Sequence, residues 1–129
     1  MTAKDKSIVV ERTLTQDEFD RFAKLSGDNN PIHVDTDFSA TTRFGRTVAH
    51  GLLLNSVLRG LLDTLVPGGR QVSQSLMFPA PTYADEPMRF TAAISFEDER
   101  IVKATMSTMR IADDVVTCAG STVIQRGAV

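Results

Sequence analysis

HGLLLNSVLRGLLDTLV, residues 50–66, is the most hydrophobic stretch of the sequence and decides the fold. When it is placed at the helical period, its nine Leu and Val residues cover most of the circumference. This pattern predicts a helix that is buried on nearly all sides and is about 25 Å long. The breaker sequence Pro67-Gly68-Gly69 ends the helix.

The half of the chain that follows this helix has the pattern of an antiparallel sheet. Four stretches rich in Val, Ile, Thr, Phe and Met predict strands at 71–79, 88–96, 100–111 and 115–125. The residues between the last three, 97–99 and 112–114, are short enough to be hairpin connections. An opening strand is predicted over 7–14. A sheet wrapped around one long helix would explain why that helix is apolar all round, so we predict an α+β fold.

Two shorter helices are predicted between the opening strand and the long helix. Thr15 and Glu18 have the spacing of a capping box, and Gly27 is suited to end the helix that it begins. Pro31 excludes a continuous helix through the preceding residues, which predicts a loop or turn over 28–31. After this loop, we expect a second helix.

Asp35 is suited to cap that second helix, which is predicted over 38–44. Gly45-Arg46-Thr47 forms the next break before the long helix.

Composition limits the class of protein. The chain has 129 residues, 42% of them hydrophobic and 23% charged, which is typical of one domain spanning 1–129. The formal net charge is −2 and no basic run is present, which excludes nucleic acid as an expected partner. The longest apolar segment, 48–66, is interrupted by polar residues, so no membrane span is predicted.

The single cysteine, Cys118, excludes an intrachain disulfide and a cysteine-rich metal site. It lies in an apolar strand-like run, where a buried and inert thiol is expected. The N-terminal sequence does not have the pattern of a signal peptide. Together these features predict a protein of the reducing cytosol.

Most polar residues suited to chemistry near neutral pH lie in one window. Both histidines, His33 and His50, fall there, with Asp28 five residues before the first. A carboxylate and an imidazole that face one point can share a water and move protons to and from it. Taken singly, Asp28 also suits a turn cap and His33 a core histidine. A metal site from the three residues is disfavoured, because no pair of histidines shares a helix face.

His50 and Gly51 open the long helix, where the first amides have no intrahelical acceptor. The amide of Gly51 can therefore stabilise a carbonyl oxygen that gains negative charge, and the missing Cβ permits close approach. Gly51 also suits tight packing at a helix start, and His50 suits a structural N-cap. An acid/base pair with such a donor is what addition of water to an α,β-unsaturated carbonyl requires.

Three segments form a longer pattern: GDNNPIHVD at 27–35, FGRTVAHG at 44–51 and FPAPTYADE at 78–86. They resemble the MaoC-like dehydratases, a family that includes the (R)-specific enoyl-CoA hydratases. In the last, Ala84-Asp85-Glu86 departs from the family's Gly-Asp turn, which places the turn geometry in question. Arg59 stands where hydratases carry small residues, so acyl chain length stays open.

The resemblance implies a hot-dog fold, in which an antiparallel sheet wraps a long central helix. It also implies an acyl-CoA or acyl carrier protein thioester as substrate, and a homodimer or dimer of dimers formed by joining sheets edge to edge. By position, Asp28 and His33 match the pair that holds the water adding to C3, and Gly51 matches the residue whose amide binds the thioester oxygen. Asn30 and His50 are given supporting roles.

The expected reaction is reversible hydration of a trans-2-enoyl-CoA to the (R)-3-hydroxyacyl-CoA, with no cofactor and no metal. Two alternatives stay open: an acyl-CoA thioesterase on the same fold, and a non-catalytic acyl-CoA-binding protein. By charge alone, the candidates for contacting the CoA phosphates are Arg46, Arg59 and Arg70.

Overall fold

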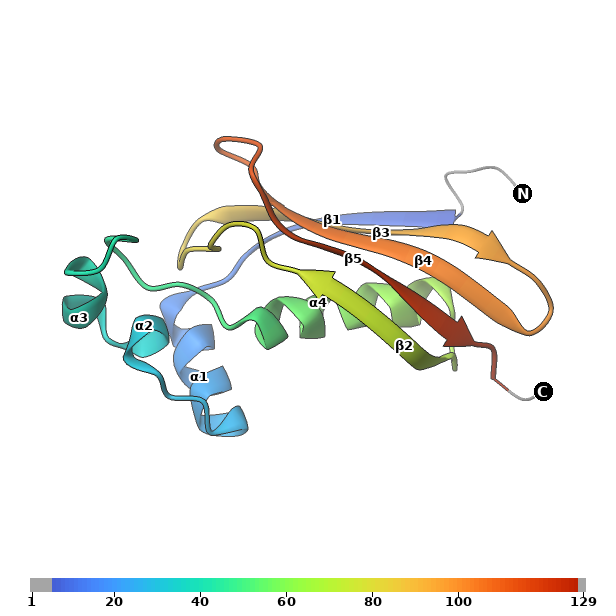
Figure 1. Ribbon diagram of the computed structural model, residues 1–129, viewed down its shortest axis with the longest axis horizontal. Helices are drawn as coiled ribbons and strands as arrows, with labels where there is room; N and C mark the ends of the chain where they lie inside the picture. The colour runs from blue at the N-terminus through green and yellow to red at the C-terminus, as the bar shows by residue number, and fades with distance from the viewer. Residues whose placement is uncertain (1–5, 128–129) are drawn as a thin grey trace.

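The computed structural model describes residues 6–127. In these residues a five-stranded antiparallel sheet lies over one long helix, α4, as Figure 1 shows. The elements in chain order are β1 Ser7–Thr13, α1 Gln16–Ser26, α2 Pro31–Val34, α3 Thr36–Ala40, α4 Gly51–Leu65, β2 Arg70–Met77, β3 Pro87–Glu97, β4 Ile101–Arg110 and β5 Val116–Gln125. The predicted α+β class and the hot-dog architecture are confirmed.

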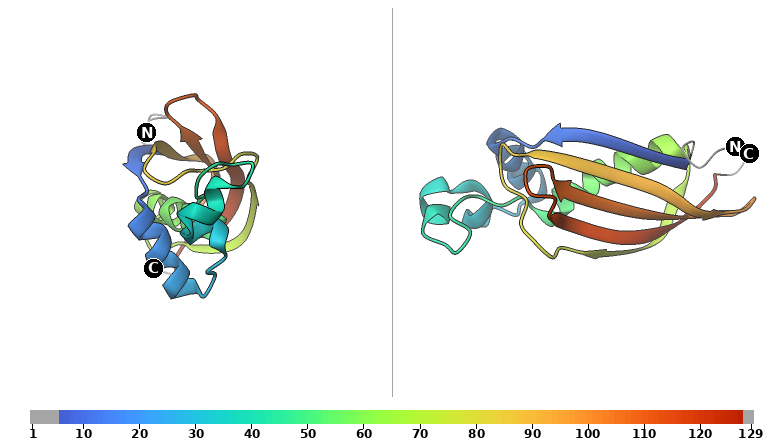
Figure 2. Two further views of the ribbon diagram at one scale, coloured as in Figure 1. Left: turned by 90° about the vertical axis from the view of Figure 1, so that its left-hand side faces the viewer. Right: turned by 90° about the horizontal axis from the view of Figure 1, so that it is seen from above.

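The sheet has the strand order β1-β3-β4-β5-β2, with every neighbouring pair antiparallel. The three strands β3, β4 and β5 are joined by the two predicted hairpins and form its centre. The chain reaches the two edges by longer routes, because β1 comes before the helices and β2 comes directly after α4. The right-hand view of Figure 2 shows α4 beneath this sheet.

The core lies between the sheet and the side of α4 that faces it. Leu54, Leu58 and Leu62 have exposed fractions of 3% or less, at a spacing of four residues that places them on one helix face. On β3, burial alternates with the strand period, and Phe90 and Ala92 are completely buried. The apolar face of the helix and the apolar face of the sheet therefore pack together in one layer.

One expectation about α4 is wrong for the single chain. The helix is not buried on nearly all sides, because Leu52 has an exposed fraction of 65% and Ser56 and Gly60 are also exposed. The physical reason is that the sheet covers only one side of the helix, and α1–α3 lie beyond its end rather than beneath it (Figure 1). No helix in the described part of the chain is both long and apolar enough to cross a membrane.

The N-terminal helices confirm the predicted caps. Thr15 and Glu18 form both bonds of the capping box, and Gly27 ends α1 in the left-handed conformation with φ of 81°. Asp35 caps α3 through the amide of Phe38. This helix covers Thr36–Ala40 rather than the predicted 38–44, because a turn follows it.

The helix α2 was not predicted. Residues 28–30 form the predicted loop, but Pro31 begins a new helix instead of closing the loop, because a proline fits the first helical position. Asn30 caps that helix by accepting a hydrogen bond from the amide of Ile32. The segment that carries His33 is therefore a helical turn.

Candidate active site

A cavity of about 770 Å³ opens at the N-terminal end of α4. Three segments that are far apart in the sequence form its walls: the turn after α1, the loop between α3 and α4, and the segment between β2 and β3. Its lining includes the predicted site residues Asp28, His33, His50 and Gly51, together with an apolar surface formed by Phe22, Phe44, Val48, Leu52, Leu54, Phe78, Pro79, Ala80 and Pro81. The structure thus brings four of the five predicted site residues to one cavity, whereas Asn30 is not part of its lining.

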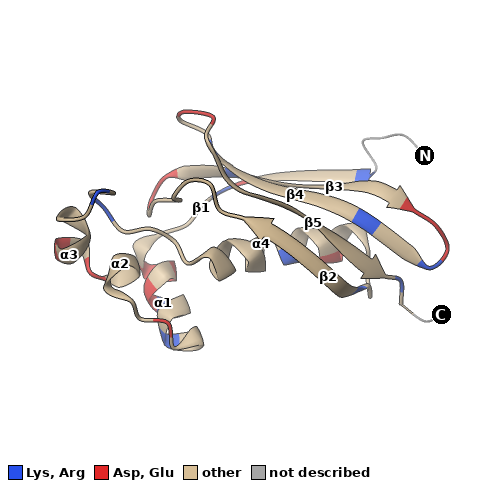
Figure 3. Ribbon diagram, in the orientation of Figure 1, with Lys and Arg blue, Asp and Glu red and all other residues tan. Residues whose placement is uncertain are grey.

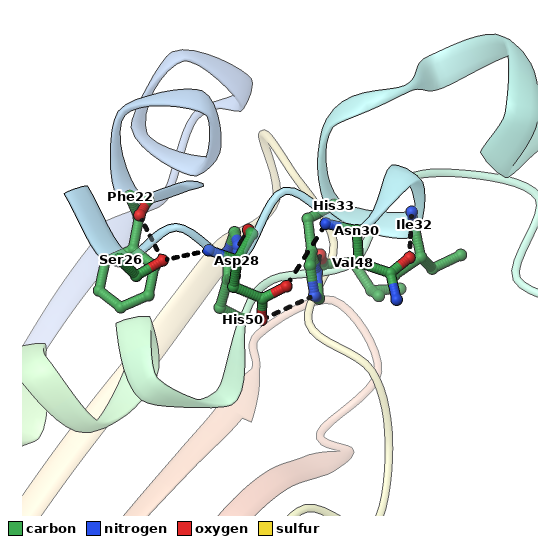
Figure 4. Close-up of polar contacts among 8 residues, drawn as sticks. All are labelled: Phe22, Ser26, Asp28, Asn30, Ile32, His33, Val48 and His50. Atoms are coloured by element: carbon green, nitrogen blue, oxygen red, sulfur yellow. Dashed lines mark hydrogen bonds and ion pairs between the residues drawn. The ribbon is translucent and has the colours of Figure 1, made fainter. Parts of the chain in front are cut away.

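The side chains of Asp28 and His33 lie next to each other in the cavity wall (Figure 4). The distance from Asp28 Oδ2 to His33 Nε2 is 3.9 Å, which is too long for a direct hydrogen bond. The other carboxylate oxygen, Oδ1, accepts a hydrogen bond from the amide of Asn30 at 3.4 Å. The two interpretations of Asp28 are therefore compatible, since one oxygen holds the turn while the other faces the imidazole.

The hydrogen bonds of His33 fix its tautomer. Its Nδ1 lies 2.7 Å from the carbonyl oxygen of Val48, and a carbonyl can only accept, so Nδ1 carries the hydrogen. In the neutral ring, Nε2 is then an acceptor with its lone pair toward Asp28. The cavity wall therefore presents two hydrogen-bond acceptors side by side, with no donor between them.

His50 lies behind this pair and contacts both members. Its Nε2 donates to the backbone carbonyl of Asp28 at 2.8 Å, and its ring stacks on His33 with centroids 3.8 Å apart and 24° between the planes. His50 occupies the predicted N-cap position of α4, but its side chain makes no capping bond. Its function in the fold is to hold the turn at Asp28.

Two buried polar atoms near the cavity have no hydrogen-bond partner among residues 6–127: Nδ1 of His50 and the hydroxyl oxygen of Thr82. Thr82 lies beside the helix start, because its carbonyl accepts from the amide of Ala49. Burial is the largest influence on His50 and lowers the pKa of its imidazole, with the nearby His33 acting in the same direction. A neutral His50 is consistent with Nε2 as its only N–H.

Gly51 contacts the ring of Phe78. A Cβ at position 51 would lie 2.8 Å from Cζ of Phe78, closer than real Cβ contacts. The packing interpretation of this glycine is therefore supported. The Gly51 amide donates to no acceptor in the described chain, so the proposed donor role is compatible with the same geometry.

The sequence comparison identifies the family. The family model described as "MaoC like domain" matches residues 2–119. The chain belongs to the MaoC-like family. Among similar proteins is an (R)-specific enoyl-CoA hydratase of Aeromonas caviae, 38% identical over 89 residues, which are 67% of this chain and 66% of that protein. One of the same name from Rhodospirillum rubrum is 31% identical over 122 residues, covering 92% and 85% of the two chains.

Solved structures agree with this membership. The (R)-hydratase of A. caviae superposes with a TM-score of 0.87 and 27% identity, covering 94% of each chain. An unliganded R-hydratase of Pseudomonas aeruginosa has a TM-score of 0.86 over 96% of this chain and 81% of its own. At 22% identity, the second supports the fold alone.

The segment at 84–86 forms a tight turn in this chain although the glycine is missing. Asp85 adopts φ of 65°, a left-handed conformation that Asp tolerates better than most residues, and its amide donates to the carbonyl of Leu14. Arg46 reinforces the turn by pairing with Glu86 and donating to the carbonyl of Ala84.

The three arginines suggested for phosphate contacts are all engaged elsewhere. Arg46 holds the turn described above. Arg59 donates to the carbonyl of Gly69, 3.1 Å away, and pairs with Asp63. Arg70 donates to Gln125. None of the three lines the cavity. The orientation of Arg59, left open by the sequence, is thus toward the far end of α4.

The stacked rings do not favour a metal. One ligand atom from each of Asp28, His33 and His50 lies within 4.8 Å of the others. However, imidazole ligands hold zinc at about 2.1 Å in the plane of each ring. Two planes that stack at 3.8 Å with 24° between them do not meet that close to the nitrogens.

Sequence reasoning missed Phe78 and Thr82 as parts of the cavity, although both lie in the quoted motif at 78–86. Only the tertiary placement of that segment against the start of α4 reveals them. Cys118 is buried as predicted, and burial raises the pKa of its thiol to about 11, so it is protonated and unreactive at neutral pH.

Proposed function

We propose that this protein hydrates a trans-2-enoyl-CoA to the (R)-3-hydroxyacyl-CoA and catalyses the reverse dehydration, as a hydro-lyase. The observation that carries the proposal is the pair of acceptors, Asp28 Oδ2 and His33 Nε2, 3.9 Å apart in the cavity wall. The names of the A. caviae and R. rubrum relatives, (R)-specific enoyl-CoA hydratases, support the reaction and its stereochemistry.

The spacing of the pair fits one water molecule. A water that donates both hydrogens in linear bonds of about 2.8 Å joins acceptors about 4.4 Å apart, and slightly bent bonds bring them to the observed 3.9 Å. Its lone pairs then point into the cavity, toward C3 of the enoyl group. The pair takes one proton as the oxygen bonds to C3, and returns one proton to C2. Because the two groups interact, they act as one dyad.

The intermediate between these steps carries negative charge on the thioester oxygen. We propose that the Gly51 amide stabilises that charge, together with the positive end of the α4 dipole. Phe78 is in contact with Gly51, so its ring moves aside when a thioester binds there. Phe78 is 47% exposed and has space to move outward.

His50 and Asn30 support the dyad without touching the reacting atoms. His50 holds the Asp28 carbonyl and packs on the His33 ring. Asn30 caps the helical turn that carries His33. Both contacts reduce the freedom of the two reacting groups, which is how positioning contributes to rate.

The assay is hydration of crotonyl-CoA, followed as loss of the enoyl absorbance, with thiol release measured in the same sample. Loss of absorbance without thiol release is expected. Thiol release would instead identify a thioesterase, in which the same water attacks C1. Binding without either change would identify a non-catalytic acyl-CoA-binding protein and contradict the proposal.

We further propose that the protein acts as a homodimer in the cytosol. The edge strand β2 exposes Val72 and Met77 by 50% and 64%, and Phe78 follows it, so an apolar sheet edge is available for pairing. A single buried thiol, Cys118, fits a reducing compartment. Light scattering after size exclusion tests the first claim, and cell fractionation the second.

A further inference from the structure

The cavity contains one positive charge that the reaction does not use. Among the described residues that line it, Arg43 is the single Lys or Arg, and Asp28 is the single carboxylate. The remaining lining is mainly apolar. A CoA or acyl carrier protein thioester carries phosphate on the arm that leaves the cavity, and phosphate recognition requires a cation or convergent N–H donors.

Arg43 is held in place while its donors stay free. Its guanidinium carbon lies over the Phe44 ring, 4.7 Å from the ring centre, which is a cation–π contact. Within residues 6–127, no carboxylate lies within 4.0 Å of it. A cation–π contact uses none of the guanidinium N–H groups as hydrogen-bond donors, and these N–H groups match the oxygens of a phosphate.

The loop that carries Arg43 has defined internal bonds. The hydroxyl of Thr42 donates to the carbonyl of Ser39 and accepts from the amide of Phe44. Gly45 closes the turn with φ of 72° and donates to the carbonyl of Thr42. Figure 3 shows Lys or Arg colour in this loop, at the end of the molecule where α1–α3 lie.

The neighbouring arginines, unlike Arg43, are hydrogen-bonded to acidic side chains. Arg46 is bonded to Glu86 and stacks on Tyr83, and Arg110 is bonded to Asp113 and to the carbonyl of Pro81. Their charges are neutralised by local partners. Arg43 is the cation of this region whose partner is missing from the described chain.

We propose that Arg43 binds the phosphate of the pantetheine arm of the thioester substrate and so determines preference for phosphate-bearing thioesters. This inference rests on the proposed function, since it assumes that the pantetheine arm of the substrate extends out of the cavity. Both CoA and acyl carrier protein carry this phosphate on their pantetheine arm.

The test compares substrates with and without phosphate. Crotonyl-CoA, crotonyl-phosphopantetheine and crotonyl-pantetheine are hydrated by the wild type, by Arg43→Gln and by Arg43→Lys. Loss of a charge-assisted bond predicts that Arg43→Gln raises KM for crotonyl-CoA about tenfold, with kcat within twofold. KM for crotonyl-pantetheine is expected not to change. For crotonyl-CoA, the KM of Arg43→Lys is expected to lie between those of the wild type and Arg43→Gln.

The matched control is Arg21→Gln, which removes an exposed arginine of α1 that pairs with Asp17 outside the cavity. It is expected to leave all three KM values unchanged. An effect with crotonyl-phosphopantetheine supports the proposal, whereas an effect confined to crotonyl-CoA would assign Arg43 to the nucleotide phosphates and overturn it. Equal changes with and without phosphate, or none with crotonyl-CoA, would overturn the proposal.

Calorimetric titration with free CoA separates this proposal from the proposed function. If the wild type hydrates none of the three esters, the reaction is wrong, but the titration still tests Arg43. A dissociation constant about tenfold weaker for Arg43→Gln is expected, and the difference should shrink as salt is added. Equal dissociation constants would overturn the role of Arg43.

Discussion

The polar groups at the two ends of α4 differ in whether they have hydrogen-bond partners. At the C-terminal end, Arg59 is bonded to the Gly69 carbonyl and to Asp63, so its charge and donors are used within the chain. At the N-terminal end, His33 Nε2 and His50 Nδ1 accept no hydrogen bond from the described residues, and the Gly51 amide finds no acceptor. Polar groups left open around one cavity mark the end where a substrate would bind.

The largest expected effect comes from changing the dyad. Asp28→Asn keeps the shape of the side chain but replaces an acceptor pair by an amide, and His33→Ala removes Nε2. Each should lower kcat for crotonyl-CoA at least a hundredfold, the size of a general acid/base contribution. The measurement is steady-state hydration at saturating substrate.

Arg59→Ala is the matched change at the other end of α4. It should leave kcat within twofold and lower the free energy of unfolding by about 1 kcal/mol, because the Asp63 carboxylate is exposed and the bond to Gly69 is only partly buried. Near-full activity in Asp28→Asn would remove the dyad from the mechanism, and a large loss in Arg59→Ala would remove the contrast between the ends.

Gly51→Ala tests which interpretation of the glycine governs activity. The new methyl group meets Phe78 and lies beside the amide, so kcat/KM should fall roughly tenfold to a hundredfold. Adding Phe78→Ala provides space for the methyl group. If approach to the amide matters, the double variant recovers its melting temperature but not its activity; recovery of both would leave packing as the only role.

Changing His50 tests whether a buried neighbour positions the dyad. His50→Phe keeps a ring against His33 but leaves the Asp28 carbonyl without its donor, and kcat should fall about tenfold with little change in KM. His50→Gln supplies an N–H at a similar reach and should retain more activity. Equal kcat values for the two variants and the wild type would show that the contact has no part in turnover.

The smallest expected effect is a change in stability with pH. Burial lowers the pKa of His50 from its ordinary 6.5, so the unfolded chain binds that proton first as pH falls. The free energy of unfolding should therefore decrease as pH is lowered from about 7 to 5, and less so in His50→Gln. Denaturant titrations across this range measure the free energy of unfolding. If it changes with pH equally in the wild type and in His50→Gln, the assignment to His50 is contradicted.

The sequence predicted the body of the fold better than the details of the site. The apolar circumference of 50–66 located α4, and stretches rich in β-branched and other apolar residues located the five strands. The exposed side of α4 was not predicted. An apolar residue such as Leu52 indicates a face that packs against something, but not whether the partner is the chain's own sheet or a second chain.

At the site, the quoted motifs predicted Asp28, His33 and Gly51, which the structure places at one cavity, but not how they are held. The contacts that fix the two imidazoles use backbone carbonyls of Asp28 and Val48, and every residue has such a carbonyl. Side-chain identity therefore carries no signal for them. The same holds for Phe78, whose contact with Gly51 depends on the path of the chain between β2 and β3.

The central claim is that one dyad both removes a proton from water and returns a proton to C2. Hydration of crotonyl-CoA in D₂O, with the configuration of the product determined at C2 and C3, tests it directly. Because Asp28 Oδ2 and His33 Nε2 lie 3.9 Å apart, both events occur on one face of the enoyl group. We predict (R)-3-hydroxybutyryl-CoA with deuterium and hydroxyl added to the same face. Addition to opposite faces would require a second proton donor and would contradict a single dyad.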